Sequence, residues 1–154
     1  MTARELFSDA RRQVVALEAI RREISALRAA RGVTGRASGT FDNAGGGTGG
    51  SCAGERLYDL EDREQRLGGI VNDTLEDLTC VLYGESGRGG VAGRLGSAAA
   101  DCVCGYYLMA MTWPQVAAEM VRPESKDGAH WCRNAAGRAF RVIDKMGVAR
   151  LKDS

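Results

Sequence analysis

Basic and polar side chains recur along one predicted helix near the end of the chain. Between residues 129 and 146 they alternate with small apolar residues at helical spacing, so that the two kinds fall on opposite faces. Arginine can donate two parallel hydrogen bonds to guanine or to a phosphate, and asparagine can bind adenine in the same way. The polar face therefore suits the major groove of double-stranded DNA. Its members are His130, Arg133, Asn134, Arg138, Arg141 and Lys145.

The two halves of this set have different expected roles. Three side chains are expected to face bases, and the other three to face the groove rim or the phosphates. Gly137 on the same face allows DNA to approach the helix closely. The buried face is formed by Cys132, Ala135, Ala139 and Val142 (or Ile143). The alternative is a plain three-helix bundle whose basic face is only solvated. The expected base contacts are Arg133, Asn134 and Arg138, and the expected rim contacts are His130, Arg141 and Lys145.

Two preceding helices must hold this face in position. Apolar residues at helical spacing predict a first helix over about 94–109. The second helix has a strong start: Thr112 as the N-cap, Pro114 in the first turn, and Gln115 closing a capping box. Pro123 ends it near Val121. The order of helix, short helix, turn and basic helix predicts a helix-turn-helix domain over 94–150.

The first half of the chain predicts a helical hairpin over 1–83. Thr2 and Glu5 form a capping box that opens a helix over about 3–31, with apolar residues three and four apart. A glycine-rich linker over 32–54, expected to be disordered, precedes a second leucine-rich helix. A further glycine-rich hinge over 84–93 marks the expected domain boundary. The fold class is therefore all-α, with a coiled-coil-like hairpin before the helix-turn-helix domain.

Charge is unevenly distributed although the net charge is only +1. Residues 1–31 hold seven basic and four acidic side chains, whereas residues 54–83 hold three basic and eight acidic ones. This asymmetry favours pairing of the two hairpin helices with each other. The apolar rows of the two hairpin helices could also pair between two copies of the chain, so formation of a homo-oligomer is a second possibility.

Several classes of function lack support in the residues. The chain has one histidine and five cysteines without zinc-knuckle spacing, which predicts no metal site. The odd number of cysteines, with no pattern of a secretory signal, predicts reduced thiols. The glycine runs have no phosphate-binding pattern, and no catalytic residues or cofactor are expected, so the protein is not expected to be an enzyme. No apolar stretch approaches the roughly 20 residues of a membrane span. The expected location is the cytoplasm.

Four stretches resemble a group of small phage and prophage proteins: residues 106–108 (YYL), 111–120 (MTWPQVAAEM), 131–134 (WCRN) and 137–140 (GRAF). They are similar to the RinA-type phage transcriptional activators and to region 4 of sigma factors, which reads the −35 promoter element. The family also begins with a long helical hairpin broken by a variable loop. This chain departs from it in two respects: it has ten residues between Met120 and Trp131, and it has Ala135 and Ala136 where the family has leucine and histidine.

The resemblance implies a sequence-specific transcriptional regulator of phage or prophage genes, with double-stranded DNA as partner and RNA polymerase as a second one. Two other functions stay open. A small terminase subunit, which binds DNA for phage packaging, also joins a helix-turn-helix to a helical oligomerisation segment. A protein-interaction module would use the hairpin to bind polymerase or another phage protein.

Overall fold

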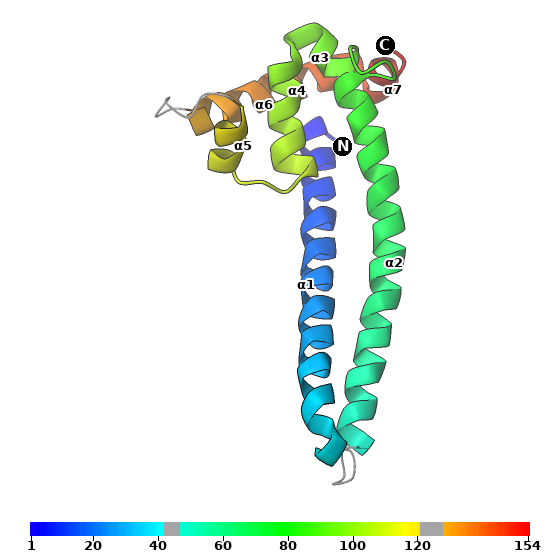
Figure 1. Cartoon of the computed structure of the whole chain (residues 1–154). Helices are drawn as coiled ribbons and strands as arrows, with labels where there is room; N and C mark the ends of the chain where they lie inside the picture. Colours follow the sequence, from blue (N-terminus) through cyan, green and yellow to red (C-terminus); the bar gives the residue numbers. More distant parts are fainter. Residues whose placement is uncertain (42–46, 121–127) are drawn as a thin grey trace. The chain divides into compact units, whose positions relative to one another are not determined.

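The computed structural model describes the backbone of residues 1–41, 47–120 and 128–154, and the side chains of residues 1–30, 54–120 and 128–154. The regular structure in these residues is entirely helical, which confirms the all-α class. None of the described helices is both long and apolar enough to cross a membrane. Figure 1 shows α1 (Ala3–Phe41), α2 (Gly47–Tyr83), α3 (Gly90–Leu95), α4 (Ser97–Val103), the π-helix η1 (Cys104–Leu108), α5 (Trp113–Glu119), α6 (Gly128–Met146) and α7 (Val148–Lys152).

The chain divides into two compact units, and the division does not fall at the predicted boundary of 84–93. Unit 1 contains Met1–Val14 together with Val71–Ser154, and unit 2 contains Val15–Ile70. The first turns of α1 and the last turns of α2 therefore belong with the C-terminal helices. The reason is burial, because both helix ends contribute side chains to the core of unit 1.

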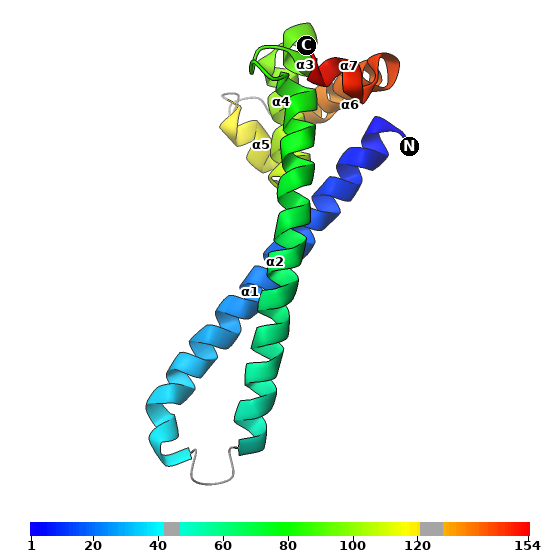
Figure 2. The same cartoon turned by 90° about the vertical axis from the view of Figure 1, so that its right-hand side faces the viewer.

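Unit 2 is an antiparallel pair made by α1 from Val15 onward and α2 as far as Ile70, and the two helices run in opposite directions in Figures 1 and 2. Ile24, Leu57 and Leu60 form its buried cluster. Arg21 pairs with Glu64 at 3.1 Å and Arg28 with Glu61 at 2.9 Å, and Glu23 pairs with Arg56 in the reverse sense. Each exposed ion pair contributes only about 0.2–1 kcal/mol. The charges therefore favour this pairing, while the apolar cluster supplies most of its stability.

The predicted interruption over 32–54 is wrong for most of that range. Helix α1 continues to Phe41 and α2 begins at Gly47. A glycine costs a helix about 1 kcal/mol relative to alanine. A helix that already exists gains a backbone hydrogen bond for each added residue without a new nucleation cost, so it can extend through such a segment. Residues 42–46 of the predicted linker lie outside the described residues.

The core of unit 1 joins residues from both ends of the chain. Phe7 is fully buried, together with Val91, Val103, Ile143 and Leu151. The ring of Phe7 lies 6.2 Å from that of Tyr107 and 5.6 Å from that of Phe140, between ring centroids. The row of residues three and four apart that predicts the first helix includes Ala3 and Ala10, which are buried, but it does not include Phe7. That row predicts pairing with the second hairpin helix, whereas Phe7 packs against η1 and α6.

The glycine-rich segment 84–93 forms a packed corner of unit 1 instead of a hinge. Gly90 begins α3 with φ of 61°, and a Cβ atom there would lie 2.4 Å from the carbonyl oxygen of Val81. Its N–H donates a hydrogen bond to the hydroxyl of Ser154 at 2.8 Å. Glycine is needed because the backbone has a positive φ and is approached closely. The segment is thus held by contacts with both α2 and the end of the chain.

The predicted helix over 94–109 is interrupted. Gly96 has φ of 94° and separates α3 from α4, and α4 continues into η1. Ala99, Cys102 and Val103 are buried as their spacing predicts, but Leu95 is 38% exposed because it precedes the break. The helices of the predicted helix-turn-helix are accordingly α4 with η1, α5 and α6. Helices α3 and α7 are additional.

Candidate nucleic-acid interface

Helix α5 begins with the capping box that the sequence predicts. The Thr112 N–H donates to Oε1 of Gln115 at 2.9 Å, and the Gln115 N–H donates to Oγ1 of Thr112 at 3.4 Å. Each bond satisfies a backbone donor that the helix itself leaves free. The helix extends to Glu119, and the predicted end near Val121 lies outside the described residues. The lengthened turn between α5 and α6 also falls largely outside them.

Helix α6 separates apolar from polar residues as predicted. Cys132, Ala135 and Ala139 are buried, and Ile143 is the buried residue at the last position instead of Val142. Two further residues of the buried side, Ala136 and Phe140, were not predicted. This side packs against α4 and α5, next to which α6 lies in Figure 1. Alanine at the contact lets helices approach closely, so the polar side of α6 is held outward by dense packing beneath it.

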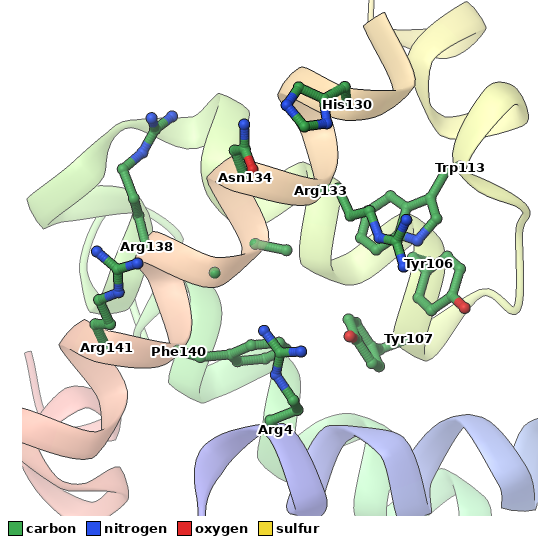
Figure 3. Close-up of a pocket in the computed structure, with 12 residues that line it drawn as sticks. Arg4, Tyr106, Tyr107, Trp113, His130, Arg133, Asn134, Arg138, Phe140 and Arg141 are labelled. Carbon is green, nitrogen blue, oxygen red and sulfur yellow. The ribbon is translucent and has the colours of Figure 1, made fainter.

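All six predicted interface residues lie on the exposed side of α6. Among the side chains of residues 1–30, 54–120 and 128–154, no carboxylate forms an ion pair with Arg133, Arg138 or Arg141. Figure 3 shows Asn134, Arg138 and His130 on one side of the helix, directed away from the aromatic residues. The guanidinium groups are thus available to an external anion or hydrogen-bond acceptor. The exposed residues are His130, Arg133, Asn134, Arg138, Arg141 and Lys145.

A pocket of about 660 Å³ adjoins this side of α6. Five of the six predicted residues line it, and Lys145 does not. Outside α6, the described lining comes from Tyr106 and Tyr107 of η1, from Trp113 of α5, and from Arg4 of α1. Every charged side chain that the described residues contribute to the lining is basic. This arrangement creates a positive potential that attracts anions.

Sequence reasoning missed Arg4. In the sequence Arg4 is only one of the seven basic residues of 1–31, and nothing in its neighbourhood signals a contact with a helix near the other end of the chain. Its guanidinium lies 5.8 Å from the centroid of the Phe140 ring. The fully buried Phe7, one turn later, is the feature that points to α1 packing against residues outside the hairpin.

The aromatic wall of the pocket is tied to α1. The rings of Tyr106 and Trp113 are stacked, with centroids 4.0 Å apart and planes 6° from parallel. The Arg11 guanidinium covers the Tyr106 ring at 3.8 Å. It also donates hydrogen bonds to the carbonyl oxygen of Met111, at 2.9 Å, and to that of Tyr106. The segment that leads from η1 into α5 is therefore braced by a side chain from the first turns of α1.

Two thiols lie where α4 meets α6. Cys102 and Cys132 are buried, and burial together with a hydrogen bond to Cys132 raises the pKa of the Cys102 thiol. Both behave as small apolar residues in this contact. Among the described residues, no group of three or more histidine, cysteine, aspartate or glutamate side chains is arranged to hold a metal ion.

Comparison of the chain with protein-family models, with curated proteins and with solved structures finds no match.

Proposed function

We propose that this protein binds double-stranded DNA through the exposed side of α6 and regulates the transcription of phage or prophage genes. The observation that carries the proposal is the row of exposed guanidinium groups on α6. Among the described residues these groups have no carboxylate partner, and none of the described residues that line their pocket is acidic. A folded protein maintains such a concentration of positive charge most readily where it binds an anion.

The dimensions of α6 suit a major groove. The helix has 19 residues, and the stretch from His130 to Lys145 extends about 22 Å at 1.5 Å per residue. A helix with side chains is roughly 10–12 Å wide, and the major groove of B-form DNA is about 12 Å wide. The exposed side of α6 can therefore follow the groove past several base pairs.

The two kinds of contact are divided along this side. Arg133, Asn134 and Arg138 would donate to base edges, with arginine favouring guanine and asparagine favouring adenine. The other three residues would contact the rim and the phosphates, which contributes affinity without sequence preference. Helix α5 would support α6 through the contact that Val116 and Cys132 help to form. The role in transcription is supported by the resemblance to RinA-type activators, which residues 106–108, 111–120, 131–134 and 137–140 carry.

The test begins with selection of binding sites by the full-length protein from a random duplex library. Affinity for the selected duplex is then compared with that for a scrambled duplex by fluorescence anisotropy. We expect the selected duplex to bind about 10³-fold tighter or more. Raising the salt concentration should weaken both complexes steeply, because bound phosphates release counterions.

Arg133→Ala and Arg138→Ala should each reduce the preference for the selected duplex by about tenfold, which corresponds to the loss of one good base contact. Arg66→Ala is the matched control, because Arg66 is exposed on α2 and pairs with Asp62 at 2.5 Å. It should leave the preference unchanged. Equal affinity for selected and scrambled duplexes, or an equal effect of all three substitutions, would contradict the proposal.

A further inference from the structure

Arg4 lies at the same pocket as the interface residues of α6, although it comes from the first turn of α1 (Figure 3). Its side chain is exposed, and no carboxylate of residues 1–30, 54–120 or 128–154 forms an ion pair with it. Its guanidinium rests over the ring of Phe140. This contact leaves the donors of the guanidinium available, since a ring face accepts the cation without taking up its N–H groups.

The turn that carries Arg4 is fixed by a hydrogen bond within it and by contacts with the rest of unit 1. The N–H of Ala3 donates to Oδ1 of Asp144 at 2.8 Å, and the N–H of Thr2 donates to a carboxylate oxygen of Glu5 at 2.7 Å. Phe7 is fully buried one turn later. Arg11 is bonded to backbone carbonyls two turns later. The base of the Arg4 side chain is therefore fixed before any ligand arrives, so only the side chain itself loses freedom on binding.

The chemistry of the pocket indicates what Arg4 would bind. Arg4 shares the lining with Arg133, Arg138 and Arg141, and in the described part of the chain no acidic residue lines the pocket. Like charges gathered in this way are stabilised by an anion between them. Arg4 comes from α1 and shares a pocket with α6, so it lies beside the helix that would enter the groove. The atoms that border a major groove at its edge are phosphate oxygens, to which a guanidinium can donate two parallel hydrogen bonds.

We propose that Arg4 binds a backbone phosphate at the edge of the groove occupied by α6, which makes the first turn of α1 part of the DNA interface. This inference rests on the proposed function. It adds a contact that comes from the opposite end of the chain and that α6 alone lacks. Because the phosphate is present at every base pair, Arg4 contributes affinity and orientation but no sequence preference.

The test measures the affinity of Arg4→Ala for the selected and scrambled duplexes across a range of salt concentrations. The plot of log affinity against log salt concentration has a negative slope, and one lost phosphate contact should make that slope shallower by about 0.9. Affinity should fall for both duplexes by the same factor, so that their ratio is preserved. Arg4→Lys keeps the charge but loses the paired donors, and it should keep the salt slope of the wild-type protein.

Arg12→Ala is the matched control, because it removes the same charge from α1 at an exposed residue that pairs with Asp9 at 3.1 Å. Urea unfolding of each variant identifies any loss of fold. If Arg4→Ala matches Arg12→Ala in affinity and salt slope while Arg133→Ala still loses preference, the Arg4 contact is overturned and the role of α6 stands. If the wild-type protein binds neither duplex, both proposals are overturned.

Discussion

The backbone N–H of Ala3 donates a hydrogen bond to Oδ1 of Asp144 at 2.8 Å, across 141 residues of sequence. This donor is one of those that the first turn of a helix leaves without a partner. A carboxylate at this point also interacts favourably with the positive end of the helix dipole. Asp144 of α6 thus caps α1 from outside, and the candidate interface helix and the start of the chain stabilise each other.

Asp144→Ala should destabilise unit 1 by about 1–2 kcal/mol, because a partly buried amide then loses a charged acceptor. Urea unfolding followed by tryptophan fluorescence measures this directly, since both tryptophans, Trp113 and Trp131, belong to unit 1. Asp73→Ala is the control, as an exposed carboxylate of the same unit. Equal unfolding midpoints for the two variants would show that the Ala3 contact contributes nothing.

Phe7→Ala should be among the most destabilising single substitutions, at about 3–5 kcal/mol, because it empties a fully buried site between η1 and α6. Tyr58→Ala removes an aromatic ring that is 75% exposed on α2, and it should change stability by less than about 0.5 kcal/mol. Urea unfolding of both variants makes the comparison. A small effect of Phe7→Ala would mean that α1 is not part of the unit 1 core.

Gly137→Ala separates folding from binding at the interface. A Cβ atom at Gly137 would have nothing within 4 Å, so the substitution should stabilise α6 by up to about 1 kcal/mol through helix propensity. If DNA approaches the backbone of α6 there, the same methyl group should weaken binding. Thermal unfolding and anisotropy measure the two effects separately.

Gly69→Ala on α2 is the control for Gly137→Ala, since a Cβ atom there is equally unobstructed. It should raise stability without changing DNA affinity. Unchanged affinity in Gly137→Ala would argue against close approach at this residue.

The Cys102 thiol should react slowly with alkylating reagents in the folded protein. Burial raises its pKa above the usual thiol range, and the thiolate is the reactive form. When the pH is raised from 7 to 9, labelling of Cys102 in the folded protein should increase much less than labelling of the same thiol in the unfolded chain. Adding denaturant should remove this difference. Mass spectrometry of labelled peptides provides the measurement. Rapid labelling of Cys102 at pH 8 without denaturant would show that the contact between α4 and α6 opens readily.

Local features of the sequence were sufficient to predict several elements. The capping boxes at Thr2 and Thr112 join residues only three apart, so the same residues form them in most contexts. The two faces of α6 follow from helical periodicity in the same way. The all-α class follows from these patterns together.

Other features depended on partners far along the chain. The apolar spacing of residues 3–31 is compatible with a hairpin helix, so it predicts that the start of α1 pairs with α2. The glycine content of residues 84–93 is compatible with a hinge, so it predicts one there. Their actual contacts are with Asp144, Phe140 and Ser154, which no local pattern identifies.

The sequence by itself therefore determined the helical class and the composition of the polar side of α6, since both arise from interactions within a few residues. Only the tertiary structure decided that Arg4 lies at the edge of that side. Burial of Phe7 against Tyr107 and Phe140 brings the first turn of the chain there. Such burial depends on the three-dimensional complementarity of distant apolar surfaces, which spacing along the chain does not encode.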